Sequence, residues 1–432
     1  MSRVQVESVP PQDLLLAYDV NICAPMVRYS KRAMRATCAR YDTQWTTTPM
    51  IVAKEFSRSQ IAREADFSTC AAERGLYEPL CDRKAATNGD EDDQGSVEAA
   101  VRWRKKRGLV GTRTQWTRPM RRVRDPDATD ESADWSSAGP SRLVRGTLIG
   151  QLAASESQPL ADGAEILAPH VDGLELNCGC PTSSAWADHI GAYLLRQPER
   201  VADMVRTLKD RLGWSYPVCV KIRLDPDLKR TDTLVRNAVE AGASVLTVHG
   251  RTRHQSSAGN PVDLEGIAFA IDVARRTGNR TGCGATSALH GRIHQPDDTE
   301  DAASGEVAVS GLSDGGGGSG GPIPCVANGD VFTLEEAHEW RRRTGAQGVM
   351  SARGLLANPA LFAGFESTPS EAVQFFCKEA LRGGGLPFQH FHRHVAYMLE
   401  SSFTRTDSVY FNSLYSTAAV MDWLRDEGWW KG

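Results

Sequence analysis

The stretch GLELNCGCP, residues 173–181, is the most informative part of this chain of 432 residues. Its first residues, 173–176, form a short apolar run that predicts a buried strand. Gly179 and Pro181 then turn the backbone and display Cys180 at the carboxyl end of that strand, where parallel α/β folds carry their chemistry. The alternative is a structural turn with two incidental thiols, because free cysteine often packs as a small hydrophobe.

Seven further segments rich in strand-forming residues occur on both sides of the predicted strand at 173–179. They are residues 21–26, 43–52, 146–154, 217–224, 245–251, 323–331 and 348–354. Apolar residues at helical spacing follow most of them, as at 28–40, 198–212, 231–241 and 333–344. Eight strand–helix units predict an α/β fold of the (β/α)8 TIM-barrel type. A doubly wound open sheet is the alternative, but eight regular units favour closure.

Two stretches, 71–143 and 277–321, interrupt this pattern. The first passes from an acidic run at 90–93 into a basic one, and the second contains GGGGSGG at 315–321. Neither offers enough apolar surface to offset the entropy of ordering it, which predicts two long, largely disordered surface insertions. Retained intron sequence is the alternative explanation.

The last part of the chain has a different pattern. Apolar residues recur at three- and four-residue spacing over 370–382, 388–403 and 407–426, which predicts two to three helices. We therefore expect a barrel domain over residues 1–365 and a small all-helical C-terminal domain over 366–432.

Composition excludes several classes of protein. Hydrophobic residues make up 41% and charged residues 24% of the chain, and the net charge of −4 gives no global attraction to nucleic acid. The ten cysteines lack metal-ligand spacing, so no metal site is expected. No signal peptide or membrane-spanning run is found, which favours a cytoplasmic or nuclear protein with reduced thiols and no membrane contact. No obligate protein partner is evident.

Polar side chains occur at the ends of at least six predicted strands. In chain order they are Gln151, Asn177, Cys180, Lys221, His249, Arg251, Asn328, Asp330 and Arg353, with Gly329 and Ala352 beside the last two. The first strand ends in Ala24, Pro25 and Met26. Polar groups at so many strand ends are unusual as core packing, but an active-site ring at one mouth of a barrel requires them.

These motifs, in this order, resemble the tRNA-dihydrouridine synthase family of flavoenzymes. The stretch NCGCP at 177–181 matches the family's catalytic cysteine motif, and VHGRT at 248–252 and VANGD at 326–330 are equally characteristic. The resemblance covers roughly residues 19–70, 144–276 and 322–365. The eukaryotic branch that acts on positions 20a and 20b of tRNA is the most similar, through TPMIV at 48–52 and ARGLLANP at 352–359.

The resemblance implies an FMN-dependent enzyme that reduces the C5–C6 double bond of a D-loop uridine in tRNA with NADPH or NADH. Two alternatives stay open. One is an FMN barrel oxidoreductase that acts on a small-molecule pyrimidine, and the other is a catalytically silent tRNA-binding protein. The two insertions and the short C-terminal region depart from the pattern of the branch.

A flavin phosphate needs backbone N–H donors, best supplied by turns after the last two strands. The turns Asn328-Gly329-Asp330 and Ala352-Arg353-Gly354 are predicted to supply them, with the Arg353 guanidinium as a charged partner. Either turn alone is also compatible with an ordinary βα loop.

The flavin ring is expected between residues of the first and third strands. Pro25, Met26 and Val27 would flank the isoalloxazine ring, and the Gln151 amide would bond its pyrimidine edge, because an amide both donates and accepts. Lys221 would stabilise negative charge near N1 and O2 of the ring. The alternative for Lys221 is an ion pair with Glu175.

Reduction of uracil needs a proton at C5 in addition to a hydride at C6. Cys180 is the predicted general acid, which requires a thiol that stays protonated at rest. Asn177 would hold the Watson–Crick edge of the base and Arg251 would also contact the substrate. His249 would reach the flavin phosphate or the base, unless it is a satisfied core residue. Cys178 is expected to point into the barrel wall.

Local basic clusters and the C-terminal helical domain over 366–432 are candidates for the tRNA surface. One cluster consists of Arg28, Lys31, Arg32 and Arg35 near the first helix, and a second runs through residues 102–124 with Trp103 and Trp116 interleaved. Basic side chains mixed with aromatic ones can bind phosphates and stack on bases. A solvated run or a nuclear-import signal is the alternative. For His392, Arg393 and His394 a polar helix face is preferred to an RNA contact, and Trp429 and Trp430 are expected to anchor packing.

Overall fold

The structure is a computed structural model that describes residues 5–79, 120–122, 142–281, 323–382 and 386–431. Its main sheet runs β3-β2-β13-β12-β11-β10-β9-β8-β4, and an additional pairing of β3 with β8 closes it into a parallel barrel of eight strands with β4 attached. The barrel strands are β2 (Val20–Cys23), β3 (Trp45–Thr47), β8 (Thr147–Ala153), β9 (Gly173–Cys178), β10 (Val218–Arg223), β11 (Val245–His249), β12 (Cys325–Gly329) and β13 (Gly348–Ser351). The predicted TIM barrel is confirmed. The one refinement is that segment 43–52 holds β3 and the short β4 (Ile51–Val52).

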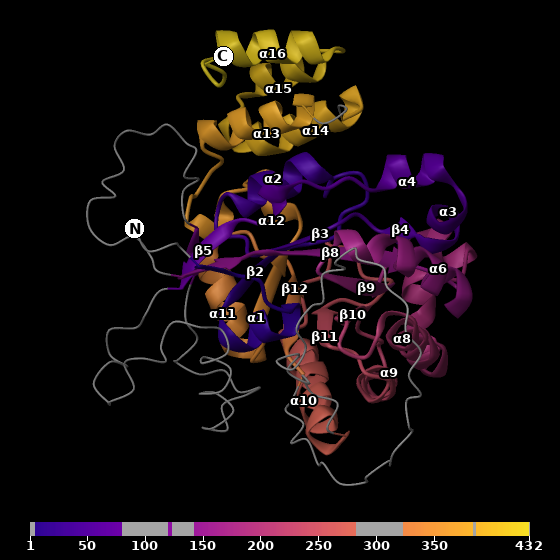
Figure 1. Ribbon diagram of the computed structural model, residues 1–432. Coiled ribbons are helices and arrows are strands. Elements are labelled where there is room, and N and C mark those ends of the chain that lie inside the picture. The colour runs from indigo at the N-terminus through magenta and orange to yellow at the C-terminus, as the bar shows by residue number, and fades with distance from the viewer. Residues whose placement is uncertain (1–4, 80–119, 123–141, 282–322, 383–385, 432) are drawn as a thin grey trace.

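Helices surround the barrel, as Figure 1 shows. They are α2 (Arg32–Ala39), α3 (Ala53–Arg58), α4 (Gln60–Asp66), α6 (Ser157–Leu167), α8 (Pro198–Leu212), α9 (Leu228–Glu240), α10 (Leu264–Thr281), α11 (Leu334–Thr344) and α12 (Arg353–Ala357). Short 3-10 turns, η1 (Ala71–Glu73), η3 (Ala168–His170) and η5 (Leu361–Ala363), join some of them. None of the helices in the described part of the chain combines the length and apolar character that crossing a bilayer requires.

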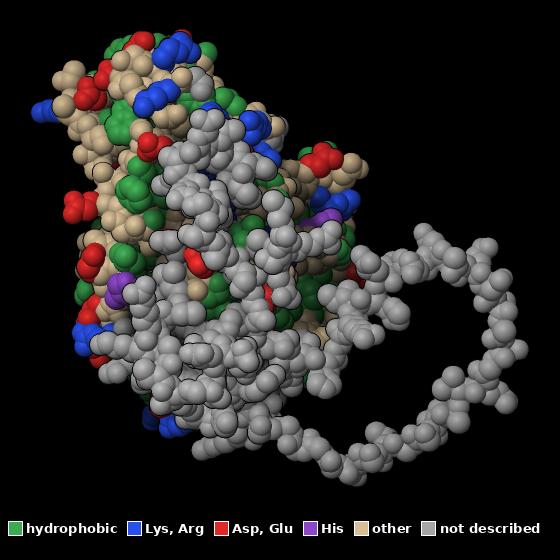
Figure 2. All heavy atoms as spheres, turned by 60° about the vertical axis from the view of Figure 1, so that its left-hand side comes forward, with side chains coloured by type: hydrophobic (Ala, Val, Ile, Leu, Met, Phe, Trp, Pro, Cys, Tyr) green, Lys and Arg blue, Asp and Glu red, His purple; other side chains and the backbone are tan. Residues whose placement is uncertain are grey.

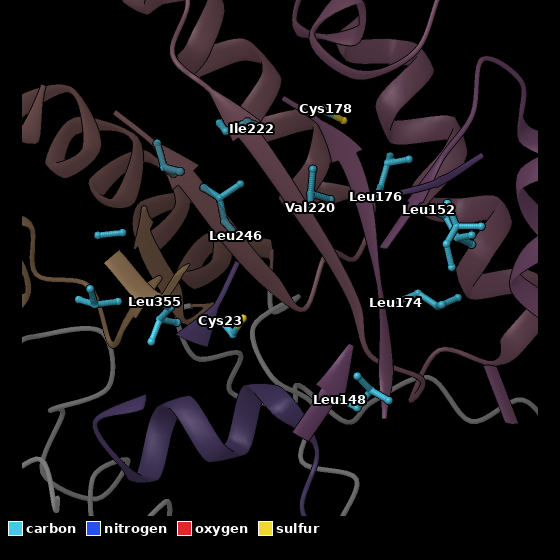
Figure 3. Close-up of a cluster of buried hydrophobic side chains, with 14 of the residues drawn as sticks. Cys23, Leu148, Leu152, Leu174, Leu176, Cys178, Val220, Ile222, Leu246 and Leu355 are labelled. Carbon is cyan, nitrogen blue, oxygen red and sulfur yellow. The ribbon is translucent and has the colours of Figure 1, made fainter. Parts of the chain in front are cut away.

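Successive side chains along each barrel strand point alternately toward the surrounding helices and into the barrel. On β9 and β10, Leu174, Leu176, Cys178, Val220 and Ile222 point outward and pack beneath the helices, as Figure 3 shows. Each such side chain is buried and contributes about 1.5–3 kcal/mol to folding. Because side chains alternate with period two, the residues between them point into the barrel. The position predicted for Cys178, in the barrel wall, is confirmed.

The barrel interior is apolar at one end and polar at the other. The apolar end is filled by side chains such as Trp45, Ile149, Cys219, Val326 and Met350, packed against the leucines of α1 (Pro11–Ala17). At the next inward position toward the carboxyl end, the side chains of β8 to β12 are polar: Gln151, Glu175, Lys221, Thr247 and Asn328. The polar mouth therefore lies opposite α1.

A second, four-stranded sheet pairs β1 (Gln5–Glu7), β7 (Arg142–Arg145), β5 (Leu76–Pro79) and β6 (Met120–Arg122) in the order β1-β7-β5-β6. Two of these strands come from the predicted insertion 71–143. Tyr77 on β5 is fully buried, and its hydroxyl lies 2.8 and 2.6 Å from the carbonyl oxygens of Ala39 and Thr43, which share its one O–H donor and tie this segment to the barrel. Most of the predicted insertions, including the basic run with Trp103 and Trp116, lies outside the described residues.

Four helices follow the barrel: α13 (Ser370–Arg382), α14 (Phe388–Leu399), α15 (Arg405–Asn412) and α16 (Thr417–Asp426), with η6 (Glu400–Ser402) between two of them. The helix predicted at 407–426 is two helices, because Ser416 caps a new N-terminus by accepting from the Ala419 N–H. Figure 1 shows this region above α2 and α12, which α13 and α14 contact. The domain boundary at 365 stays a prediction.

The histidines of α14 are part of this core. His392 and His394 are buried, and their rings stack on Phe411 and Phe376 at 4.7 and 5.0 Å. A polar helix face is therefore wrong for both, since only Arg393 between them is exposed. Trp429 and Trp430 pack against the core, as expected.

Candidate active site

Cys180 lies in the loop that follows β9, at the polar mouth of the barrel. The Asn177 side chain holds this loop, because its Oδ1 accepts the backbone N–H groups of Gly179 and Cys180 at 3.0 Å each. The Cys180 carbonyl oxygen accepts the Ala192 N–H at 2.9 Å, and its Sγ lies 3.4 Å from Thr182 Oγ1. The thiol is half-buried and held at the mouth.

Four polar side chains connect β8, β9 and β11 below this loop. Asn177 Nδ2 donates to Gln151 Oε1 at 2.7 Å, and Gln151 Nε2 donates to Glu175 Oε1 at 2.7 Å. Thr247 Oγ1 donates to the other oxygen of Glu175 at 3.3 Å. Burial raises the pKa of Glu175, while Lys221 acts in the opposite direction. Gln151 still has one N–H and one lone pair for a ligand.

Lys221 projects from β10 into the same space. It forms no hydrogen bond or ion pair with the residues that the structure describes, so the alternative of a Glu175 ion pair is not realised. Burial lowers the pKa of Lys221 to about 8, an effect that the Glu175 charge opposes. An unpaired cation inside a barrel is costly unless a ligand supplies the counter-charge.

Arg223 is a residue that the sequence reasoning missed. Its Nε donates to the Gly179 carbonyl at 2.9 Å and its Nη1 to the Thr252 carbonyl at 3.0 Å, so it joins the Cys180 loop to the loop after β11. Burial, followed by the neighbouring Arg251, lowers the pKa of Arg223 to about 10. Its position two residues after Lys221 puts both side chains on one face of β10, a signal that the period-two pattern contained.

Three charged groups meet between the ends of β11 and β12 and the start of α12. Asp330 pairs with both Arg251 and Arg353, and Arg251 Nε also donates to the Asn260 carbonyl at 2.8 Å. Burial raises the pKa of Asp330, but the hydrogen bonds from the two arginines outweigh it and leave that pKa below its usual range. Arg251 is 2% exposed, whereas the Arg353 side chain is 49% exposed. Only Arg353 is open to a ligand.

His249 ends β11 beside this cluster. Its Nε2 is buried and has no hydrogen-bond partner among the described residues. Burial, reinforced by Lys221, Arg223, Arg251 and Arg353, lowers the pKa of His249 to about 2, so the ring is neutral. It is therefore not a satisfied core histidine, and an unfilled polar atom at this point fits a bound ligand.

The turns after β12 and β13 are built by close packing. Asn328 is buried, and its Nδ2 donates to the Met350 carbonyl at 3.0 Å. Gly329 is required because a β-carbon there would lie 2.5 Å from the Trp340 ring. Ala352 precedes α12 and is partly buried.

The loop after β2 leads to the other side of the mouth. The Met26 N–H donates to Ser30 Oγ at 2.9 Å. Met26 and Pro25 before it are both half-buried. Val27 is 52% exposed and lines a cavity of about 510 Å³. Pro49 and Met50 after β3 and His390 of α14 also line this cavity, which therefore lies between the loops after β2 and β3 and the C-terminal helices.

The basic cluster Arg28, Lys31, Arg32 and Arg35 lies at the start of α2 and on it, and only some of its side chains reach the surface. Arg35 is 1% exposed and forms a buried ion pair with Glu73 at 2.6 Å, so its predicted role in tRNA contact is wrong. Lys31 Nζ donates to the Ala65 carbonyl at 2.7 Å and lines the cavity together with Arg28.

Comparison with known proteins agrees with this arrangement. The family model described as dihydrouridine synthase (Dus) matches residues 114–273 and 318–420. Among curated relatives, the mouse tRNA-dihydrouridine(20a/20b) synthase [NAD(P)+]-like protein is 33% identical over 94% of this chain and 88% of its own length. The chain belongs to the dihydrouridine synthase family. The human protein of the same name is 32% identical and the synthase of Schizosaccharomyces pombe 31% identical, each over 94% of this chain, covering 90% and 86% of those proteins.

Membership of the dihydrouridine synthase family confirms the resemblance seen in the motifs. It also confirms an oxidoreductase that acts on CH–CH bonds and takes part in tRNA processing. The matched residues hold β8 to β13, and with them Gln151, Cys180, Lys221, His249 and Arg353. The loop with Pro25, Met26 and Val27 lies before the match. The roles of the individual residues stay predictions.

Proposed function

We propose that this protein is an FMN-dependent tRNA-dihydrouridine synthase that uses NADPH or NADH to reduce a D-loop uridine at position 20a or 20b. The names of the mouse, human and fission-yeast relatives support this position and the nicotinamide reductant. The observation that carries the proposal is the barrel mouth itself, where the half-buried thiol of Cys180 acts electrostatically on Lys221, a lysine of the barrel interior that has no hydrogen bond or ion pair with the described residues.

The side chains of the mouth fit a flavin mononucleotide. Within the described part of the chain, neither Lys221 nor the Nε2 of His249 has a partner of the kind that an anionic ligand offers. In the proposal Lys221 balances charge on the flavin pyrimidine edge, to which Gln151 bonds with its remaining N–H and lone pair. Arg353 binds the phosphate, helped by the turns 328–330 and 352–354. Pro25, Met26 and Val27 flank the ring.

The proposed chemistry uses two hydrogen sources. When bound and reduced by NAD(P)H, FMN would supply a hydride for C6 of the uracil. Cys180 donates a proton to C5, so that the C5–C6 double bond becomes a single bond and the thiolate is later reprotonated from solvent. Asn177 and Arg223 hold the Cys180 loop. Arg251 is buried against Asp330, which suits a role in holding the strand ends in place. Direct substrate contacts of Asn177 and Arg251 stay predictions.

tRNA is the proposed partner, and the surface around the mouth has the side chains to bind it. The Arg253 guanidinium lies 3.4 Å above the ring of Trp186, which belongs to the short helix α7 (Ser183–Ala187) that follows Cys180. His189 stacks at 4.4 Å on Tyr193 of the next 3-10 helix, η4 (Gly191–Arg196). Figure 2 shows Lys and Arg side chains on the C-terminal helices and at their junction with the barrel. Basic and aromatic groups together suit an unstacked, single-stranded loop.

The decisive experiment compares tRNA from cells with and without this protein. Dihydrouridine at 20a and 20b should disappear when the gene is deleted and return with the wild-type gene. Loss at another position alone would overturn the site assignment. Unchanged dihydrouridine, together with turnover of free pyrimidines by the purified protein, would favour the small-molecule oxidoreductase.

A further inference from the structure

Glu175 is fully buried in the barrel, yet the proposed chemistry gives it no role. It is the register partner of Gln151 on the neighbouring strand, and one of its oxygens accepts from the Gln151 amide at 2.7 Å. The Gln151 oxygen accepts from Asn177 at 2.7 Å, and Asn177 Oδ1 accepts from the Cys180 N–H at 3.0 Å. A continuous chain of hydrogen bonds therefore joins Glu175 to the backbone of Cys180.

The groups at the two ends of this chain of hydrogen bonds decide which atoms donate and which accept. At the Cys180 end the loop presents two N–H donors, so Asn177 must turn its oxygen toward them and its amide nitrogen toward Gln151. At the other end an ionised carboxylate can only accept, so Gln151 must turn its nitrogen toward Glu175 and its oxygen toward Asn177. Both requirements select the same orientation of the two amides.

Burial raises the pKa of Glu175, but three neighbours stabilise its ionised form and lower that pKa. Lys221 does so through its charge, and Gln151 and Thr247 donate hydrogen bonds to the two oxygens of Glu175. A protonated Glu175 could instead donate to Gln151 and permit the reversed chain, which would turn the Asn177 nitrogen toward the N–H of Cys180. Ionised Glu175 removes that alternative.

We propose that Glu175 is a positioning residue, which acts through Gln151 to fix the Asn177 amide and thereby the place of Cys180 at the mouth. This inference rests on the proposed role of Cys180 as the proton donor. It assigns no contact between Glu175 and the substrate.

Two substitutions together can reverse the direction of this chain of hydrogen bonds. Asn177→Asp places a carboxylate beside the loop N–H groups, from which it can still accept. Its other oxygen, however, meets the Gln151 oxygen, and two acceptors cannot bond. Gln151 cannot turn its nitrogen toward the new carboxylate, because Glu175 accepts from that nitrogen. Adding Glu175→Gln supplies a donor at 175, so Gln151 can turn round and the whole chain is satisfied in the opposite direction. Glu175→Leu in the Asn177→Asp background is the control, because it removes the same negative charge without supplying a donor.

The first measurement needs neither flavin nor tRNA. Alkylation of Cys180 by iodoacetamide, followed by mass spectrometry of its peptide, reports the placement of the thiol, and a melting curve confirms that each variant is folded. We expect Asn177→Asp to change the alkylation rate roughly 10-fold, as loss of a buried hydrogen-bond network does. Adding Glu175→Gln should return the rate to within about threefold of wild type, and Glu175→Leu should not.

The second measurement follows oxidation of the reduced, FMN-loaded enzyme by tRNA. We expect the maximal rate to fall in Asn177→Asp, to recover when Glu175→Gln is added, and not to recover with Glu175→Leu. The tRNA concentration at half-maximal rate should stay nearly unchanged. The inference is overturned if Glu175→Gln and Glu175→Leu rescue equally, or if neither rescues. If wild-type enzyme fails to modify tRNA, the proposed function fails, whereas the alkylation series still decides the role of Glu175.

Discussion

Gly191 lies directly against the backbone of Cys180. A β-carbon on Gly191 would stand 2.8 Å from both the Cβ and the carbonyl oxygen of Cys180, and the φ angle of Gly191 is +64°. The thiol is therefore positioned from two sides, by the Asn177 side chain and by the absence of a side chain at Gly191.

Gly191→Ala should slow the reaction without unfolding the protein. The left-handed conformation costs an alanine about 1–2 kcal/mol, and the contact with Cys180 must be relieved by moving the loop. We expect the rate of flavin oxidation by tRNA to fall by roughly 10-fold or more, since small displacements of reacting groups are costly. Gly428→Ala is the matched control, because Gly428 has φ +78° with nothing within 4 Å. Equal rates in the two variants would contradict the positioning role of Gly191.

Arg353→Ala should weaken FMN binding. The Arg353 guanidinium is half exposed and shared with Asp330, so we expect the effect of losing one charged hydrogen bond near the lower end of its range, roughly 10-fold in Kd. Fluorescence titration of the flavin-free protein measures it, with Arg343→Ala, on the outer helix α11, as control. The mass of the cofactor released by heat should be that of FMN. Unchanged affinity would remove Arg353 from the phosphate site.

His249 should make the flavin-free protein less stable in acid. Its pKa is lowered to about 2 in the folded state, mainly by burial, from an ordinary value near 6.5. Below about pH 6.5 only the unfolded chain takes up this proton, so the contribution of His249 to stability is complete above that pH and is lost as the pH falls, by up to ~1.4 kcal/mol per unit. Urea unfolding at pH 7 and pH 5.5 should show a smaller loss in His249→Gln than in wild type. Parallel losses would show that His249 is protonated in the folded protein.

The buried pair of Arg35 and Glu73 should be essential for folding. Glu73→Gln leaves the guanidinium buried without its counter-charge, which costs about 3–5 kcal/mol. Glu165→Gln, which removes one of the two acidic partners of Arg211 on the exposed face of α6, should cost about 0.5 kcal/mol or less. Urea denaturation compares the two. Similar midpoints would mean that segment 71–79 is not tied to the barrel as described.

The barrel was predictable because its signal is local. Each strand is a short apolar or alternating run, and side chains at the strand ends must meet at one mouth once the sheet closes. The ring from Gln151 to Arg353 therefore followed from order along the chain. Arg223 was open to the same reasoning, because it shares a strand face with Lys221.

Other features depend on contacts between distant segments, which no local pattern contains. Arg35 looks like a surface residue until Glu73, 38 positions away, is placed beside it. His392 and His394 look polar until aromatic rings from other helices cover them. Strand β5 has no regular pattern of its own, since the packing of Tyr77 and its pairing with β6 and β7 define it. The partners of Glu175 likewise required the strand register.

The central claim is that Cys180, and not Cys178, donates the proton to C5. Stopped-flow absorbance of the flavin follows reduction by NADPH and oxidation by tRNA as separate steps. Cys180→Ala should bind FMN and tRNA normally and be reduced at the wild-type rate, but its oxidation by tRNA should slow by ~10²–10⁴-fold, the range for losing a positioned acid. Cys178→Ala, whose thiol is buried in the barrel wall, should oxidise nearly as fast as wild type. Rapid oxidation of Cys180→Ala, or a stall in Cys178→Ala alone, would contradict the account.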